Sequence, residues 1–209
     1  MDGVIPGRTV PVYPSEKGVQ ETPAEKEICA IVLGARSNHP LGMFGPGFKE
    51  IGDYMNRMQA ELDSTPKTHG FLGASSWLSS ADRGTSSEAM TLMYFESSEA
   101  LHAYAHGPLH TETMEWWSRM VKDIPHLAIM HEVFAAPKHS WEGVYLNYHP
   151  TGLGATAVEV ERDGKNVWVN PLVKGTGKLT YSKGRMGKVF SYDSEWKAYD
   201  DTLGVGEKE

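Results

Sequence analysis

The order in which strand-like and helix-like patterns follow one another restricts the fold of this chain more than any other feature. Strand patterns cover 28–33, 70–78, 89–95 and 127–136, and helical patterns cover 48–62 and 97–122. Short apolar runs rich in β-branched residues indicate strands, and apolar residues three or four positions apart indicate helices. The resulting βαββαβ order predicts a ferredoxin-like α+β fold, in which both helices cover one face of an antiparallel sheet.

The second helical pattern contains an interruption at Gly107-Pro108. Proline is tolerated at the first position of a helix, because the N–H that it lacks would have no partner there. We therefore expect one helical piece to end before Gly107 and another to begin at Pro108. Helical spacing from that start places four residues on one face: His110, Met114, Trp117 and Val121. This spacing predicts that His110 points toward the sheet.

Outside this unit, the patterns are weaker. Residues 1–26 contain four prolines and three glycines without a sustained period, so we predict an extended N-terminal arm that wraps a partner subunit. We place the ferredoxin-like domain at 27–137. Residues 138–209 are expected to form a C-terminal extension that packs on this domain, with a β-hairpin turning at Asp163-Gly164.

Composition excludes several classes of protein. The 209 residues are 40% hydrophobic and include six tryptophans, which is enough for a folded core. A net charge of −7 with scattered basic residues argues against nucleic acid as a partner. The sequence shows no apolar run long enough to span a membrane and no secretory leader, so we expect a cytoplasmic protein. With Cys29 as the single cysteine, neither a disulfide framework nor a cysteine-based metal site is expected.

Three segments carry a resemblance to known proteins: SSEALHAYAHGPLH (97–110), HEVFAAP (131–137) and WEGVYLNYHPTGLGA (141–155). They resemble a fungal family of dimeric α/β-barrel monooxygenase-like proteins, to which the polyketide monooxygenase of fumagillin biosynthesis belongs, and the likeness covers residues 26–156. The matching positions in the last two segments are His131, Glu132, Pro137, Tyr145, Asn147, Pro150, Gly152, Leu153 and Gly154. The resemblance implies a homodimer in which the uncovered sheet faces of two copies meet. It also implies oxidation of a hydrophobic secondary metabolite.

Two histidines are the candidate catalytic residues. Related barrels place a histidine on the second helix, so the resemblance implies that His110 is a general base or an axial haem ligand. A hydrogen-bonded core histidine is the alternative interpretation. His131 is the second candidate, and it cannot form an acid–base dyad with Glu132 because adjacent strand residues point to opposite faces.

Aromatic and methionine side chains are expected at the interface between helices and sheet. The candidate substrate-binding residues are Trp77, Tyr94, Tyr104, Met114, Trp117 and, on the glycine-containing loop, Asn147. If they do not simply fill the core, they line an apolar pocket suited to a polyketide or terpenoid. The sequence contains no phosphate-binding loop or dinucleotide fingerprint, so the expected cofactor is either none or haem, with molecular oxygen as co-substrate.

Three functions remain open at this point. The first is a monooxygenase in which an electron-rich substrate reduces oxygen directly. The second is a redox-neutral cyclase, isomerase or dehydratase that uses the same pocket with acid–base chemistry. The third is a protein that binds a hydrophobic ligand without converting it.

Overall fold

The computed structural model describes residues 3–15, 22–79 and 87–188. The chain divides into two compact units, one formed by Cys29–Ala135 and the other by Met1–Ile28 together with Ala136–Glu209. The sequence analysis placed the corresponding boundaries at 27 and 137. None of the helices in the described ranges is long and apolar enough to cross a membrane.

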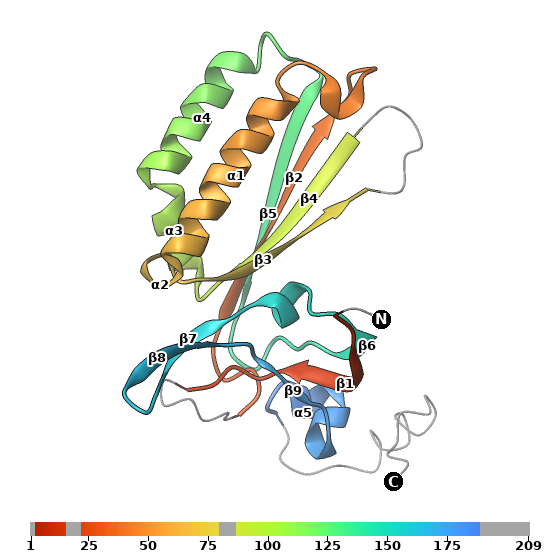
Figure 1. Ribbon diagram of the computed structural model, residues 1–209, viewed down its shortest axis with the longest axis vertical. Coiled ribbons are helices and arrows are strands. Elements are labelled where there is room, and N and C mark those ends of the chain that lie inside the picture. Colours follow the sequence, from red (N-terminus) through yellow and green to blue (C-terminus); the bar gives the residue numbers. More distant parts are fainter. Residues whose placement is uncertain (1–2, 16–21, 80–86, 189–209) are drawn as a thin grey trace. The chain divides into compact units, whose positions relative to one another are not determined.

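The first unit has the predicted βαββαβ order (Figure 1). Its elements are β2 (Ile28–Ser37), η1 (Gly42–Phe44), α1 (Phe48–Ser64), α2 (Pro66–His69), β3 (Phe71–Leu78), β4 (Ser87–Phe95), α3 (Ser98–Ala105), α4 (Pro108–Met120) and β5 (Leu127–Ala136). The strands form one sheet in the order β3-β4-β2-β5, with β4 antiparallel to both β3 and β2. The helices lie on one face of this sheet, so the ferredoxin-like fold is confirmed.

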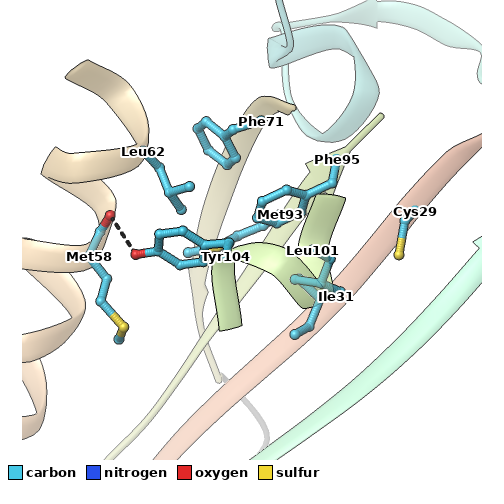
Figure 2. Close-up of a cluster of buried hydrophobic side chains, with 9 residues drawn as sticks. All are labelled: Cys29, Ile31, Met58, Leu62, Phe71, Met93, Phe95, Leu101 and Tyr104. Atoms are coloured by element: carbon cyan, nitrogen blue, oxygen red, sulfur yellow. Dashed lines mark hydrogen bonds between the residues drawn. The ribbon is translucent and has the colours of Figure 1, made fainter. Parts of the chain in front are cut away.

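A cluster of apolar side chains between the helices and the sheet forms the main core (Figure 2). Its buried members are Cys29, Ile31, Met58, Leu62, Phe71, Met93, Phe95, Leu101 and Tyr104. The odd-numbered residues of β2 and β4 supply the sheet side of this cluster. Because side chains alternate along a strand, the even-numbered residues of both strands point to the opposite, uncovered face.

The uncovered face of the sheet is largely apolar. Its apolar side chains include Val32, Trp77, Met90, Leu92, Met130 and Phe134. A Cβ atom built on Gly34 would lie 2.8 Å from Cγ of Met130, which places the even-numbered residues of β5 on this face as well. Phe134 is 55% exposed, so this face has no cover within the unit itself.

The predicted interruption of the second helical segment is confirmed. Helix α3 begins after Ser97, whose hydroxyl accepts a hydrogen bond from the amide of Ala100 at 3.1 Å. Helix α4 begins at Pro108, directly after the extended residue Gly107.

The predicted inward face of α4 is wrong by about one position. The residues that pack toward α1 and the sheet are Leu109, Thr113, Trp116, Trp117 and Met120. Met114 is 41% exposed, and His110 is half-buried at the edge of the inward stripe. Adjacent aromatic residues at 116 and 117 made two helical phases nearly equivalent in the sequence, and packing against α1 selects one of them.

The second unit contains a three-stranded sheet and a hairpin. Its elements are β1 (Ile5–Pro11), β6 (Tyr145–Tyr148), η2 (Gly152–Ala155), β7 (Val158–Arg162), β8 (Lys165–Val169), β9 (Leu172–Lys174), η3 (Gly177–Thr180) and α5 (Ser182–Arg185). Strand β1 lies between β6 and β9 and is antiparallel to both. The predicted β7–β8 hairpin is confirmed, and Asp163 and Gly164 both have the positive φ angles of its turn.

The prediction of an extended arm at residues 1–26 is therefore wrong for the described residues that form β1. Strand β1 is a central strand of a sheet, and Val10 and Val12 are almost fully buried. Pro6 and Pro11 hide the strand pattern in the sequence, and the pairing partners are more than a hundred residues away. Residues 16–21 of the predicted arm and residues 189–209 of the predicted extension lie outside the described residues.

Candidate functional site

His110 lies in the first turn of α4, next to the end of α3. Its imidazole is half-buried, and the edge of its ring faces Tyr104 with the ring centres 6.5 Å apart and the planes at 67°. The backbone of Ala105 lies close enough to the imidazole to raise its pKa. In a neutral imidazole one ring nitrogen carries the proton, and the other can accept a proton or bind a ligand.

The surroundings of His110 favour its neutral form. Burial lowers the pKa of His110 below its ordinary value of 6.5, and nearby His131 and His106 lower the pKa further. The backbone of Ala105 opposes these effects in part. A neutral imidazole is the form that a general base requires at neutral pH.

Tyr104 forms the wall beside this imidazole. Its side chain is buried in the main core, and its hydroxyl donates a hydrogen bond to the carbonyl oxygen of Met58 at 3.3 Å (Figure 2). Burial raises the pKa of Tyr104, and neighbouring Glu61 raises it further, so the phenol stays protonated. Tyr104 therefore holds its position through the fold, and its ring is the part that faces His110.

His131 lies on β5, on the face of the sheet that the helices cover. Leu127 of the same strand packs into the helix-facing cluster with Ile51, and side chains two residues apart share a face. His131 is solvent-exposed, and no residue in the described ranges forms a hydrogen bond with its side chain. It lies close enough to His110 to influence the pKa of that residue. Glu132 points to the opposite face, as predicted.

The structure separates the other predicted pocket residues. Trp117 packs in a second helix-facing cluster around Ile124. Trp77 and Tyr94 lie on the uncovered face of the sheet, because Trp77 pairs with Met90 and Tyr94 lies between two residues of the core. The expectation that both face the helices is therefore wrong. A bulge between Phe71 and Gly73 shifts the alternation of β3, and the sequence gives no sign of it.

Asn147 belongs to the other compact unit, where it has a structural role. Its φ angle is +50°, and its side-chain oxygen accepts a hydrogen bond from the amide of Gly7 at 2.8 Å. The bond connects β6 to a bulge in β1, where the pairing shifts between Ile5 and Arg8. The carboxamide oxygen is thus engaged with the backbone.

Sequence reasoning did not identify His69. Its ring makes an edge-to-face contact with Tyr104, with the ring centres 5.1 Å apart and the planes at 75°. The only local signal was Pro66 followed by Gly70, which bound the single-turn helix α2 and set the position of His69. The ring contacts of His69, Tyr104 and His110 connect the three helices α2, α3 and α4.

The described residues contain no group of three or more histidine, cysteine, aspartate or glutamate side chains arranged to hold a metal ion. The histidine neighbours of His110 are His106, which is exposed on the end of α3, and His131. The arrangement is therefore a pair of imidazoles from α4 and β5, bordered by aromatic and aliphatic side chains.

Comparison with known proteins gives the family. The sequence model of the Monooxygenase af470-like family matches residues 28–153. This chain belongs to that family. Its relative Monooxygenase af470 from Aspergillus fumigatus is 32% identical over 192 residues, which cover 90% of this chain and 69% of the relative. The family match includes all of the ferredoxin-like unit that holds His110 and His131, and it extends through β6 to Leu153.

Distant likenesses to solved structures were also found. SnoaB, a cofactor-independent oxygenase from Streptomyces nogalater, is 11% identical, with a TM-score of 0.34 over 53% of this chain and 93% of that chain. An aldoxime dehydratase is 13% identical, with a TM-score of 0.41 over 74% of this chain and 44% of the other.

Proposed function

We propose that this protein is a monooxygenase that oxidises a hydrophobic secondary metabolite, a polyketide or a terpenoid, with His110 as the general base. Membership of the Monooxygenase af470-like family supports the class of reaction. The observation that carries the assignment of His110 is its environment: the imidazole is half-buried beside the ring of Tyr104, and burial favours its neutral form.

The chemistry that fits this environment needs an acidic C–H group in the substrate. The available nitrogen of His110 takes a proton from a CH₂ group that is activated by a neighbouring carbonyl or aromatic ring. The resulting carbanion supplies electrons to O₂, and a carbon–oxygen bond forms. Loss of water then converts CH₂ and O₂ into C=O and H₂O, so one oxygen atom enters the product and the substrate itself is the reductant.

His131 supports the same step from the strand. We assign it the role of hydrogen-bond donor to the oxygen on which negative charge develops, because it shares the helix-facing side of the sheet with the inward side chains of α4. Partly buried apolar residues that pack against the main core, including Leu33, Met55 and Leu109, suit a substrate with few polar groups.

The active protein is proposed to be a homodimer formed through the uncovered face of the sheet. Exposed Met90, Met130 and Phe134 make this face too apolar for a stable surface in water. Arg36 and Glu88 form an ion pair at 3.3 Å at one end of the same face. Met130→Asp should convert the dimer to a monomer in size-exclusion chromatography with light scattering, whereas Met114→Asp, on the helical side, should leave the dimer intact.

Haem is the alternative to a cofactor-free reaction. The unprotonated nitrogen of a neutral His110 imidazole fits the role of axial ligand as well as that of base. A haem titration separates the two: a sharp Soret band that disappears in His110→Ala assigns a ligand role. If the wild-type protein shows no such band, the ligand role is excluded and His110 keeps the proposed role of general base.

Oxygen dependence tests the proposal directly. The purified protein is screened against polyketide and terpenoid metabolites, and any compound that is converted is assayed again without oxygen. A monooxygenase stops under anaerobic conditions. Undiminished anaerobic turnover would replace the proposal with a redox-neutral cyclase, isomerase or dehydratase, and binding without conversion would leave a ligand-binding protein.

A further inference from the structure

The loop between β2 and α1 carries several large apolar side chains that are exposed to solvent. Phe44 is 85% exposed and Leu41 is 61% exposed, and the short helix η1 between them carries Met43, which is 42% exposed. Residues 40–47 read PLGMFGPG, a run of eight without one polar side chain. Such a cluster of exposed large apolar side chains is unusual for a loop, since loops usually carry polar residues.

The backbone of this loop is well ordered. Hydrogen bonds run from the amide of Gly42 to the carbonyl of His39 at 2.8 Å and from the amide of Phe44 to the carbonyl of Leu41 at 3.1 Å. The Nδ1 atom of His39 accepts a hydrogen bond from the amide of Leu41 at 3.1 Å. The ring of His126 faces His39 at 5.0 Å and bonds the carbonyl of Pro46 at 2.8 Å. The fold therefore fixes the loop while leaving its apolar side chains in water.

Leu78 is a further exposed apolar side chain at this end of the sheet. It is 72% exposed at the end of β3 and pairs with Ala89, near the start of β4. The register of β2 with β4 places Ser37, just before the loop, at the same end of the sheet. Figure 1 shows the loop at that end, between the tip of β2 and the beginning of α1. We call the loop surface formed by Leu41, Met43 and Phe44 the apolar tip.

The described charges at the two helix ends beside the apolar tip give no positive excess. Lys49 pairs with Asp53 in the first turns of α1, where Glu50 adds a further negative charge, and Arg119 pairs with Glu115 at the end of α4. Both helix ends adjoin the loop, since His126, which follows α4, bonds Pro46. Within the described residues these helix ends therefore offer no net positive charge to attract anionic lipid, and the whole chain carries a charge of −7.

We propose that the apolar tip inserts into the surface of an electrically neutral lipid bilayer. A specific protein partner would normally use hydrogen bonds, about one per 100–200 Å² of interface, and residues 40–47 offer no side chain to make them. A fluid apolar medium requires only apolar side chains on a rigid support, which the loop provides. The proposal does not depend on the reaction that the protein catalyses, and its test needs no substrate.

The test is co-sedimentation of the full-length protein with phosphatidylcholine vesicles. We expect half of the wild-type protein to sediment at a lipid concentration on the order of 1 mM. The double variant Leu41→Ser, Phe44→Ser should require at least about tenfold more lipid, because two of the inserting side chains are lost. The matched control is Trp168→Ser, which removes an exposed apolar side chain from the β7–β8 hairpin and should sediment like the wild type.

Two further readouts decide the outcome. Leu41→Cys labelled with an environment-sensitive NBD fluorophore should shift its emission to the blue when vesicles are added, and Cys29 is too buried to react in the folded chain. Replacing one fifth of the lipid with phosphatidylserine, or raising the salt concentration, should change binding less than twofold. The proposal is wrong if the wild type stays in the supernatant, if the double variant sediments equally well, or if the label shifts only when another protein is added.

Discussion

The two compact units use their polar side chains in different ways. In the unit that contains residues 136–188, three polar side chains are engaged with the fold: Asn147 bonds Gly7, Tyr145 bonds the backbone of the η2 loop, and Glu142 bonds Arg185. In the ferredoxin-like unit, the imidazole of His110 makes a ring contact with Tyr104, and the side chain of His131 has no hydrogen-bond partner in the described ranges. Polar groups that the fold has already used provide stability, and those that it leaves available can provide chemistry.

The strongest test of this difference is His110→Ala. Loss of a general base should lower kcat by about 10²- to 10⁴-fold, while the melting temperature changes by only about 2 °C. The matched control is His102→Ala, which removes an exposed histidine from α3 and should leave both quantities unchanged. Comparable effects of the two substitutions on kcat would contradict the role of His110 as the general base.

In the other unit, Glu142→Gln should have the opposite effect: it should lower stability and leave kcat unchanged. The carboxylate accepts hydrogen bonds from Nε of Arg185 and, at 2.7 Å, from the hydroxyl of Ser182, which connects α5 to the segment before β6. We expect a loss of about 2 kcal/mol in the free energy of unfolding, since a largely buried pair would lose one charge. Thermal unfolding measures the loss, and kcat per folded molecule should be unaffected.

Tyr145→Phe should give a smaller effect of the same kind. The Tyr145 hydroxyl donates to the carbonyl of Thr151 and accepts from the amide of Gly154, each at 2.8 Å, and so holds the η2 loop. Removing it takes away one of two acceptors of the Gly154 amide, which also bonds the carbonyl of Thr151 at 2.9 Å, so we expect a cost of about 1 kcal/mol, measured by denaturant titration. A large loss of activity in a fully folded Tyr145→Phe protein would mean that the η2 loop takes part in chemistry.

The smallest expected effect is on the pH dependence of kcat/KM. The base form of His110 is lost as the pH falls through its pKa, which burial places below 6.5, so the acid limb of the profile should have its midpoint below that value. Because His131 lowers the pKa of His110, His131→Asn should move the midpoint toward higher pH. A midpoint that does not move would contradict an influence of His131 on the pKa of His110.

Local sequence signals predicted most of the ferredoxin-like unit. Residues 127–136 form the expected strand, Ser97 caps α3, and Pro108 starts α4, because each of these features depends on residues within a few positions of one another. The hairpin turn at Asp163-Gly164 was predictable for the same reason, since both residues tolerate positive φ.

Features that depend on distant partners were not predictable. Strand β1 is defined by pairing with residues 145–148 and 172–174, and its own sequence contains two prolines. The face of Trp77 depends on the bulge in β3, and the inward side of α4 depends on contacts such as that of Thr113 with Met58. His69 lies beside Tyr104 across the core, which no local pattern indicates. The sequence therefore indicated His110, His131 and the neighbouring Tyr104, and missed His69.

The central claim is that His110 begins an oxidation in which the substrate reduces O₂. It is tested most directly by turnover under ¹⁸O₂ with mass spectrometry of the product, for the wild type and for His110→Ala. The account predicts one ¹⁸O atom in each product molecule of the wild type and almost no product from the variant. An unlabelled product, or a variant that forms labelled product at the wild-type rate, would contradict it.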